Sequence, residues 1–167
     1  DLEEPVRGYN DFLRALLASR SRCAVWPLID DMQASGVAPD AATCSILLKS
    51  LTEHSHSDDV TRAMALLHQM REPINEVVFA AAAKACIRMG RLDQLSALWQ
   101  QLDAQDAPLT LNAPCYGSMI KAYGHARDVE RLWELWEEMS RRDVRPTAIT
   151  LGCMVDALVK NGAVDDA

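Results

Sequence analysis

Four cationic residues recur in this sequence at nearly constant spacing, and this pattern is typical of a surface that binds phosphate groups. Arg14, Lys49, Lys84 and Lys121 follow one another at intervals of 35, 35 and 37 residues. Equivalent positions of stacked helical repeats share a face, so we predict that these side chains form a basic stripe. Such a stripe suits the backbone of a nucleic acid. The alternative is a set of solvated side chains that were copied when the repeat was duplicated.

No other combination of residues in the sequence predicts catalysis or metal binding. His54 and His56 lie near Glu53 and Asp58, but no further ligand occurs at the spacing of a metal site, and we interpret this segment as a polar loop. No motif places a base beside a nucleophile. The five cysteines include no CxxC pair, which indicates reduced thiols. We therefore expect neither an enzyme nor a bound cofactor.

The composition predicts an α-helical core. Of the 167 residues, 49% are hydrophobic but only 5% are aromatic, so Leu, Ala, Val, Ile and Met must form most of that core. No apolar run reaches the 18 residues that indicate a membrane span. The net charge is −7, whereas compact nucleic-acid-binding domains are usually basic. The total charge thus argues mildly against such a role, and its distribution matters more.

A five-residue pattern, apolar-apolar-polar-polar-apolar, reveals the repeat that positions the cations. Its copies are Leu28–Met32, Leu66–Met70, Leu98–Leu102 and Leu135–Met139. Each repeat of about 35 residues predicts two antiparallel amphipathic helices, which bury their apolar faces by stacking on neighbours. We divide the chain into a lead-in at 1–5, repeats at 6–40, 41–75, 76–112 and 113–147, and a truncated repeat at 148–167, which suggests a longer parent chain.

The predicted repeats are not uniform. Residues 53–58 lengthen the loop between the two helices of the second repeat by about three residues. Two extra residues around Ala107–Leu109 lengthen the third repeat. Pro27 falls in the second helix of the first repeat, where it should delay the start of that helix to about Trp26 or kink the helix.

The repeat motif resembles the pentatricopeptide repeat family. The resemblance rests on the 35-residue length and on the segments YNDFLRALL, LIDDMQASGVAPD, WELWEEMSRRDVRPT and LGCMVDALVKNGAVDDA, and it covers nearly all of residues 6–167. Tetratricopeptide repeats, with 34 residues and a different motif, fit less well. The resemblance implies an all-α, right-handed α-solenoid whose first helices line a groove for single-stranded RNA, with one base per repeat. It also implies a location in the mitochondrion or a plastid.

In this family, the fifth residue of a repeat and its last residue select the base. Asn10 and Asp40 form the pairing that the family uses for uracil, whereas two of the other fifth residues lack a hydrogen-bonding side chain. The resemblance therefore implies weak sequence specificity. Carried over in order, the pairs are Asn10 with Asp40, Ser45 with Asn75, Ala80 with Asn112, and Gly117 with Thr147.

The charge distribution supports a groove on the first helices. The second to thirteenth residues of the repeats include seven basic and three acidic residues, although the whole chain has 17 basic and 24 acidic ones. Arg88, His125 and Lys160 form a second row at the ends of the first helices, where the family places phosphate contacts. Asp156 interrupts the basic stripe in the fifth repeat.

Two functions follow from these patterns. The first is an organellar single-stranded RNA-binding module that acts in RNA processing, stability or translation. The second is a structural scaffold in a large organellar complex such as a ribosome. In that function, protein subunits would dock on the acidic second helices, for example at residues 130–138. An enzyme whose catalytic domain lies outside these residues is a third, weaker interpretation.

Overall fold

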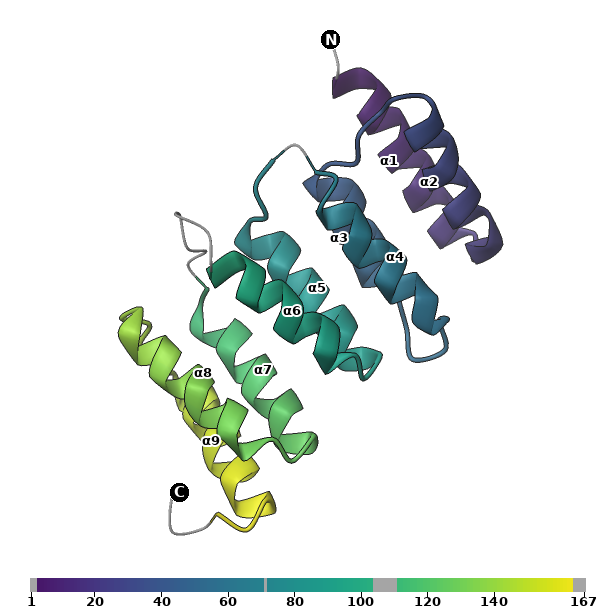
Figure 1. The fold of residues 1–167 in the computed structure, drawn as a ribbon. Helices are drawn as coiled ribbons and strands as arrows, with labels where there is room; N and C mark the ends of the chain where they lie inside the picture. Colours follow the sequence, from purple (N-terminus) through teal and green to yellow (C-terminus); the bar gives the residue numbers. More distant parts are fainter. Residues whose placement is uncertain (1–2, 71, 104–110, 164–167) are drawn as a thin grey trace. The chain divides into compact units, whose positions relative to one another are not determined.

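The computed structural model describes residues 3–70, 72–103 and 111–163, and within these ranges the secondary structure is helical (Figure 1). The chain divides into two compact units, an N-terminal unit of residues 1–89 and a C-terminal unit of residues 90–167. The elements are α1 Glu3–Ala18, η1 Arg22–Ala24, α2 Val25–Ala34, α3 Ala41–Ser50, α4 Ser57–Leu67, α5 Glu76–Arg88, α6 Leu92–Asp103, α7 Ala113–His125, α8 Val129–Arg141 and α9 Ala148–Lys160.

The observed helices and units depart from the predicted division in two places. α1 begins at Glu3, inside the predicted lead-in. The third predicted repeat is divided, because α5 belongs to the N-terminal unit and α6 to the C-terminal unit. The extra residues predicted around Ala107–Leu109 lie outside the described residues.

A polar residue begins each first helix after α1. The side chain of this N-cap accepts a hydrogen bond from the backbone N–H three residues later, at distances from 2.7 to 3.2 Å. Such a cap satisfies a donor that helix geometry leaves unpaired, and it contributes about 1 kcal/mol. The caps are Asp40 for α3, Asn75 for α5, Asn112 for α7 and Thr147 for α9. These are also the last residues of the predicted repeats. The residues predicted to contact a base from that position therefore cap a helix as well.

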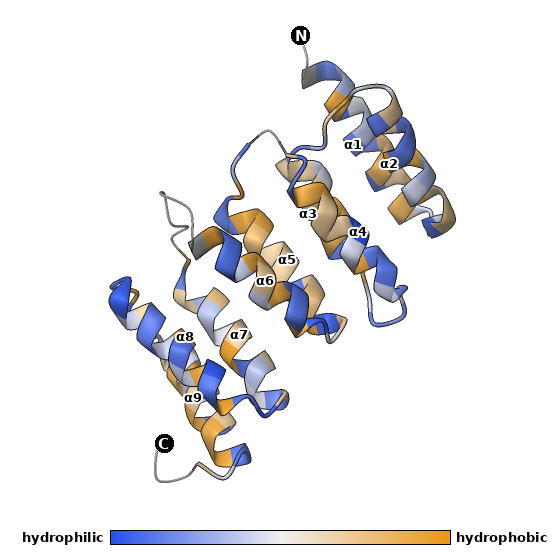
Figure 2. Ribbon diagram, viewed as in Figure 1, coloured by the Kyte–Doolittle hydropathy of each residue, from blue (hydrophilic) through white to orange (hydrophobic). Residues whose placement is uncertain are grey.

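In the N-terminal unit, α3 packs against both α1 and α5, and the hairpins α1–α2 and α3–α4 complete the core. Leu13, Leu47 and Phe79 are buried in this core, and burying a side chain of this size contributes about 1.5–3 kcal/mol. The hydropathy colouring in Figure 2 agrees with this packing, because α3 and α5 are largely hydrophobic.

A polar cluster joins the second helices α2 and α4. The indole N–H of Trp26 donates to the Asp59 carboxylate at 2.7 Å. The guanidinium of Arg62 lies over the Trp26 ring, 4.2 Å from its centre, and pairs with Asp30 at 2.7 Å. Cation–π contacts of this kind stabilise by about 0.5–2 kcal/mol. Polar and aromatic side chains therefore join the second helices α2 and α4.

The predicted irregularities of the first two repeats are confirmed. α2 begins at Val25, so Pro27 lies in its first turn, where a missing N–H is tolerated. Residues 51–56 connect α3 to α4, whereas three residues connect α5 to α6 and α7 to α8. The loop is shorter at its end than expected, because Ser57 and Asp58 are the first residues of α4.

In the C-terminal unit, α7 packs against α8 and most extensively against α9. Small residues allow the α7–α9 contact. A Cβ atom added at Gly124 would lie 2.6 Å from the Cβ of Ala157, a distance that real side chains do not adopt. At Gly117, in contrast, an added Cβ would lie 3.7 Å from the Cα of Thr150, an ordinary contact. The close approach therefore depends on glycine at position 124 and not at position 117.

Left-handed residues follow the first helices α1, α5, α7 and α9. Arg20 follows α1 with a φ of 60°. Gly90 and Gly162 follow α5 and α9 with φ of 67° and 78°. Arg127 takes the same place after α7 with φ of 61°, although a side chain makes this conformation unfavourable. Among the described residues, no helix has the length and apolarity to cross a lipid bilayer.

Candidate nucleic-acid interface

The structure brings the first predicted base-reading pair together and buries much of it. Asn10 on α1 is 3% exposed, and its Nδ2 donates to Oδ1 of Asp40 at 3.1 Å. The Oδ1 of Asn10 accepts a hydrogen bond from Oγ1 of Thr43 at 2.7 Å. Thr43 is the third residue of α3 and is also buried. The pair is therefore held in place by a residue that the sequence analysis did not single out.

The carboxylate of Asp40 is stabilised in its charged form. Its Oδ1 accepts from the backbone N–H of Thr43 at 2.7 Å and from Nδ2 of Asn10, and it lies 2.8 Å from Oγ1 of Thr43, whose single proton is shared between Asp40 and Asn10. Burial raises the pKa of Asp40, but the hydrogen bonds from Thr43, Asn10 and Ala42 outweigh it, so the pKa lies below its ordinary value. Burial and the charge of Asp40 together raise the pKa of the neighbouring Cys44 to about 12, which keeps this thiol neutral.

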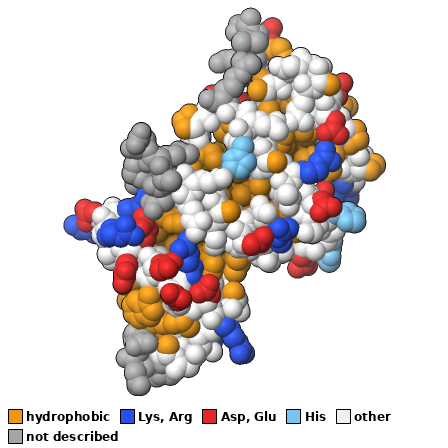
Figure 3. Space-filling model, in the orientation of Figure 1, with side chains coloured by type: hydrophobic (Ala, Val, Ile, Leu, Met, Phe, Trp, Pro, Cys, Tyr) orange, Lys and Arg blue, Asp and Glu red, His pale blue; other side chains and the backbone are white. Residues whose placement is uncertain are grey.

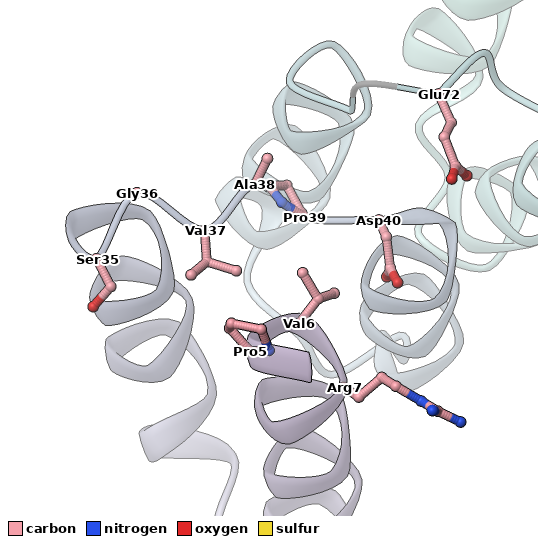
Figure 4. A pocket seen from close by; sticks show the side chains of 10 residues that line it. All are labelled: Pro5, Val6, Arg7, Ser35, Gly36, Val37, Ala38, Pro39, Asp40 and Glu72. Atoms are coloured by element: carbon pink, nitrogen blue, oxygen red, sulfur yellow. The ribbon is translucent and has the colours of Figure 1, made fainter. Parts of the chain in front are cut away.

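A hollow of about 720 Å³ opens beside Asp40 (Figure 4). Its size is within the range of small-ligand sites. The side chains labelled in Figure 4 give it an apolar part and a charged part. The bonds from Asn10 and Thr43 end on Oδ1 of Asp40, and the Asp40 side chain is part of the lining of the hollow. The apolar part consists of Pro5, Val6, Val37, Ala38 and Pro39, and the charged part of Arg7, Asp40 and Glu72.

The other predicted base readers offer fewer polar groups. Ser45 is 8% exposed, and Ala80 and Gly117 have no polar side-chain atom. Their predicted partners Asn75 and Asn112 are exposed, and each has one side-chain oxygen engaged in the helix cap. The first repeat thus combines two polar reading side chains with a hollow that can receive a ligand group.

The predicted basic stripe is exposed to solvent. Arg14, Lys49 and Lys84 occupy equivalent positions on α1, α3 and α5, and α3 packs against both of its neighbours. Arg14 pairs with Asp11 on the same helix at 2.8 Å, but both side chains are more than half exposed. Exposed pairs of this kind are weak, so Arg14 remains able to contact a phosphate. Lys121 has the equivalent exposed position on α7 of the C-terminal unit.

The second predicted row of cations ends the first helices, and two of its members make contacts within the protein. Arg88 ends α5, and its guanidinium donates to the carbonyl oxygen of Leu48 at 2.8 Å. Lys160 ends α9 and pairs with Asp156 at 2.7 Å. Asp156, which interrupts the stripe, is thereby partly neutralised. His125 ends α7 and is exposed.

The acidic second helix α8 is less uniformly negative than its sequence suggests. Figure 3 shows acidic and basic side chains together over this helix. Glu138 is 5% exposed and contacts both Arg141 and Arg142, and Glu134 contacts Arg131. Arginines of the same helix therefore offset much of the charge that was predicted to attract a basic partner.

The polar loop at His54 and His56 has no metal site among the described residues. His54 lies 3.6 Å from Glu53 and both are exposed, while His56 is the N-cap residue of α4.

Sequence reasoning missed Thr43 and the hollow for different reasons. The residues that line the hollow come from α1, from the loop before α3 and from position 72, and no periodic pattern connects them. A signal for Thr43 was present, because a threonine three residues after an N-cap aspartate can complete a capping box, as it does here.

The profile of the PPR repeat family matches residues 111–167. A mitochondrial pentatricopeptide repeat-containing protein of Arabidopsis thaliana is 25% identical over 74% of this chain. The small ribosomal subunit protein mL103 (rPPR7) of the same plant is 24% identical over 96% of this chain. The chain is thus similar to pentatricopeptide repeat proteins, by the family profile over residues 111–167 and by these relatives over most of its length. It spans 29% and 39% of the lengths of these two relatives.

Solved structures of pentatricopeptide repeat (PPR) proteins share the fold of this chain. The PPR domain of Arabidopsis thaliana protein-only RNase P 1, crystallised with tRNA, matches 96% of this chain and 84% of its own length, with a TM-score of 0.71 at 16% identity. PPR10, crystallised with an 18-nt psaJ RNA element, matches 96% of this chain and 24% of its own, with a TM-score of 0.67 at 23% identity. The predicted all-α solenoid fold is confirmed.

Proposed function

We propose that this chain is a single-stranded RNA-binding module of an organellar PPR protein, with weak sequence specificity and no catalytic role of its own. The observation that carries the proposal is the combination, in the N-terminal unit, of a reading pair beside a hollow and an exposed basic stripe on the same first helices. The apolar part of the hollow suits the face of a base, the Asp40 carboxylate suits an N–H donor, and the stripe suits phosphates.

Relatives support an RNA partner and an organelle. PPR10 and the PPR domain of RNase P 1 were crystallised with RNA. The mitochondrial 15S rRNA processing factor ppr3 of Schizosaccharomyces pombe is 23% identical over 93% of this chain, which spans 22% of that protein. The names of this protein and of the Arabidopsis relative favour the mitochondrion over a plastid.

Weak specificity follows from the reading positions themselves. Ala80 and Gly117 cannot hydrogen-bond a base through their side chains, and Asn10 is largely engaged within the protein. Most of the affinity should therefore come from phosphate contacts, which do not depend on the base.

The test compares two variants with the same change in net charge. Lys49→Glu with Lys84→Glu reverses two stripe positions, whereas Arg141→Glu with Arg145→Glu reverses two exposed arginines at and after the end of α8. We expect the first variant to weaken binding of a mixed single-stranded RNA pool at least roughly tenfold, and the second to have little effect. Fluorescence anisotropy at several salt concentrations gives the affinity and its salt dependence.

The salt dependence gives a second readout. Three contacts from Arg14, Lys49 and Lys84 predict a slope of about −2 in a plot of log K against log salt, because each contact contributes about −0.7. A slope near zero, or an equal loss of affinity in both variants, would contradict the proposed groove.

A scaffold in a ribosome is the second candidate, because the relative mL103 is a small ribosomal subunit protein that aligns with 96% of this chain. Complete absence of RNA binding by the unaltered protein would favour this candidate. A protein subunit of the complex would then be expected to bind the second helices, where α8 presents its mixed charges (Figure 3).

A further inference from the structure

We propose that Thr43 is a positioning residue of the base site in the first repeat, and that its hydroxyl sets the orientation in which Asn10 and Asp40 meet a base. This inference rests on the proposed function. The residue belongs to the second repeat, so the base preference of one repeat depends on the next. The evidence is the network formed by these three side chains and its incomplete counterpart in the C-terminal unit.

The hydroxyl of Thr43 lies between the two reading side chains. Its Oγ1 is 2.7 Å from Oδ1 of Asn10 and 2.8 Å from Oδ1 of Asp40, and Thr43 is 1% exposed. With its oxygen held by Thr43 and its Nδ2 by Asp40, the Asn10 amide has one favoured orientation. Without the hydroxyl, the buried amide oxygen loses its donor, which favours rotation of the amide.

The shorter bond of the helix cap does not involve the Thr43 hydroxyl, because it is the backbone N–H of Thr43 that donates to Asp40 at 2.7 Å. Thr43→Val keeps that N–H and the branched shape. It removes the hydroxyl and with it the longer capping-box bond, at 3.3 Å, from the backbone N–H of Asp40. Thr43→Ser keeps the hydroxyl and removes a methyl group. Positioning requires the hydroxyl, which Thr43→Ser keeps and Thr43→Val lacks. Packing requires the methyl group, which Thr43→Val keeps and Thr43→Ser lacks.

The fixed orientation selects a class of base. A carboxylate accepts hydrogen bonds but does not donate them, so Asp40, which lines the hollow, favours a base that presents a ring N–H, as uracil and guanine do. Adenine and cytosine present an acceptor at the corresponding ring nitrogen. If the Asn10 amide rotated, its oxygen would take the place of its NH2 group beside Asp40. This change would weaken the preference for uracil and guanine over adenine and cytosine.

The C-terminal unit has a threonine at the position equivalent to Thr43, but no asparagine and aspartate at the positions equivalent to Asn10 and Asp40. Thr150 follows Gly117 by 33 residues, as Thr43 follows Asn10. Oγ1 of Thr150 lies 2.9 Å from Oγ1 of Thr147 and 3.3 Å from the carbonyl oxygen of Ala113. The space at Gly117 accepts a Cβ. Gly117→Asn with Thr147→Asp would therefore supply the two missing members beside a threonine that is already in place.

The experiment measures affinity for oligo(U) and oligo(C) of equal length by fluorescence anisotropy. We expect Thr43→Val to lower the ratio of the two affinities roughly three- to tenfold, and Thr43→Ser to retain the ratio of the unaltered protein. Thr150→Val is the matched control and should leave the ratio unchanged. The side-chain amide resonances of Asn10 should move in Thr43→Val and stay in place in Thr43→Ser.

The transplanted pair gives an arm that does not depend on the stability of the Thr43 variants. Gly117→Asn with Thr147→Asp should raise the oligo(U) to oligo(C) ratio several-fold, and adding Thr150→Val should abolish that gain. A double variant that gains nothing, although it folds, would count against a transferable three-residue site.

The outcomes separate this inference from the proposed function. If Asn10→Ala lowers the ratio and Thr43→Val does not, Thr43 has no positioning role and the inference is overturned while RNA binding stands. If the unaltered protein binds neither oligonucleotide, the proposed function fails and this inference fails with it. If Thr43→Ser behaves like Thr43→Val, packing by the methyl group explains the effect and the inference is again overturned.

Discussion

The crossing of α1 and α3 and the crossing of α7 and α9 have the same register but different chemistry. In the first, Asn10 meets Thr43 through a hydrogen bond of 2.7 Å, and Asp40 joins them. In the second, Gly117 meets Thr150 without a side chain. One repeat register therefore produces either a buried polar network or a close approach of two helices.

This difference explains why the two crossings are suited to different roles. The polar network places the Asp40 carboxylate beside a hollow, which is where the proposed function places base recognition. The glycine crossing gives more extensive helix contact, with Gly124 against Ala157, but presents no polar group of its own at the reading position. We infer that the first crossing serves recognition and the second mainly serves stability.

The largest effect should come from breaking the close crossing. Gly124→Ala places a Cβ 2.6 Å from the Cβ of Ala157 and should destabilise the C-terminal unit by about 1–3 kcal/mol. Gly152→Ala is the control, because it lies on the exposed side of α9 with no atom near an added Cβ, and it should stabilise by up to about 1 kcal/mol. Urea unfolding measures both. Equal stability of the two variants would show that the crossing is not tightly packed.

The second-largest effect should come from removing a helix cap, and the loss of stability should differ between the two crossings. Asp40→Ala loses the cap of α3 and also the partner of Asn10, so we expect a cost of about 2 kcal/mol. Thr147→Ala loses a cap and the hydroxyl contact with Thr150, and it should cost about 1 kcal/mol. The midpoints of thermal unfolding test the order. A larger loss for Thr147→Ala would contradict the view that Asp40 organises the first crossing.

Acid should weaken the first crossing specifically. The pKa of Asp40 is lower in the folded protein than in the unfolded chain, so its contribution to stability is present above the unfolded pKa, at about 4, and is lost as the pH falls through the folded pKa. Asp40→Asn should flatten this part of the pH dependence. Urea unfolding between pH 5 and pH 2 measures it, and an unchanged slope in the variant would exclude Asp40 as its source.

The smallest effect is expected at a helix end. Arg127→Gly should stabilise the C-terminal unit by about 0.5–1 kcal/mol, because glycine adopts a φ of 61° without steric cost. The same substitution at Arg145, which is exposed and lies outside a helix, should give no such gain. Calorimetry of the two variants resolves this difference. A loss of stability in Arg127→Gly would show that the arginine side chain makes a compensating contact.

The sequence predicted the helices well because their signals are local and periodic. The extra loop residues before Ser57 and the effect of Pro27 follow from spacing and from the chemistry of proline. The N-cap role of Asp40 was equally readable, since an aspartate before an apolar run is a helix-start signal. The predicted base-reading pairs came instead from a family resemblance, and their role remains a prediction.

The sequence could not reveal the burial of Asn10 or the charges that cancel on α8. Burial depends on the neighbouring helix, and here Thr43 reaches Asn10 from 33 residues away. On α8, the acidic run suggested a negative surface, but Glu138 turns inward and contacts two arginines. Both features require the positions of side chains in three dimensions, and a single sequence does not specify these.

The most direct test of the account is to map single-stranded RNA onto the protein by NMR chemical-shift perturbation. The proposed function predicts that oligo(U) perturbs the first helices α1, α3 and α5, around Asp40, Lys49 and Lys84, and leaves the second helices α2 and α4 largely unchanged. Perturbations confined to the second helices, or none at saturating RNA, would contradict it.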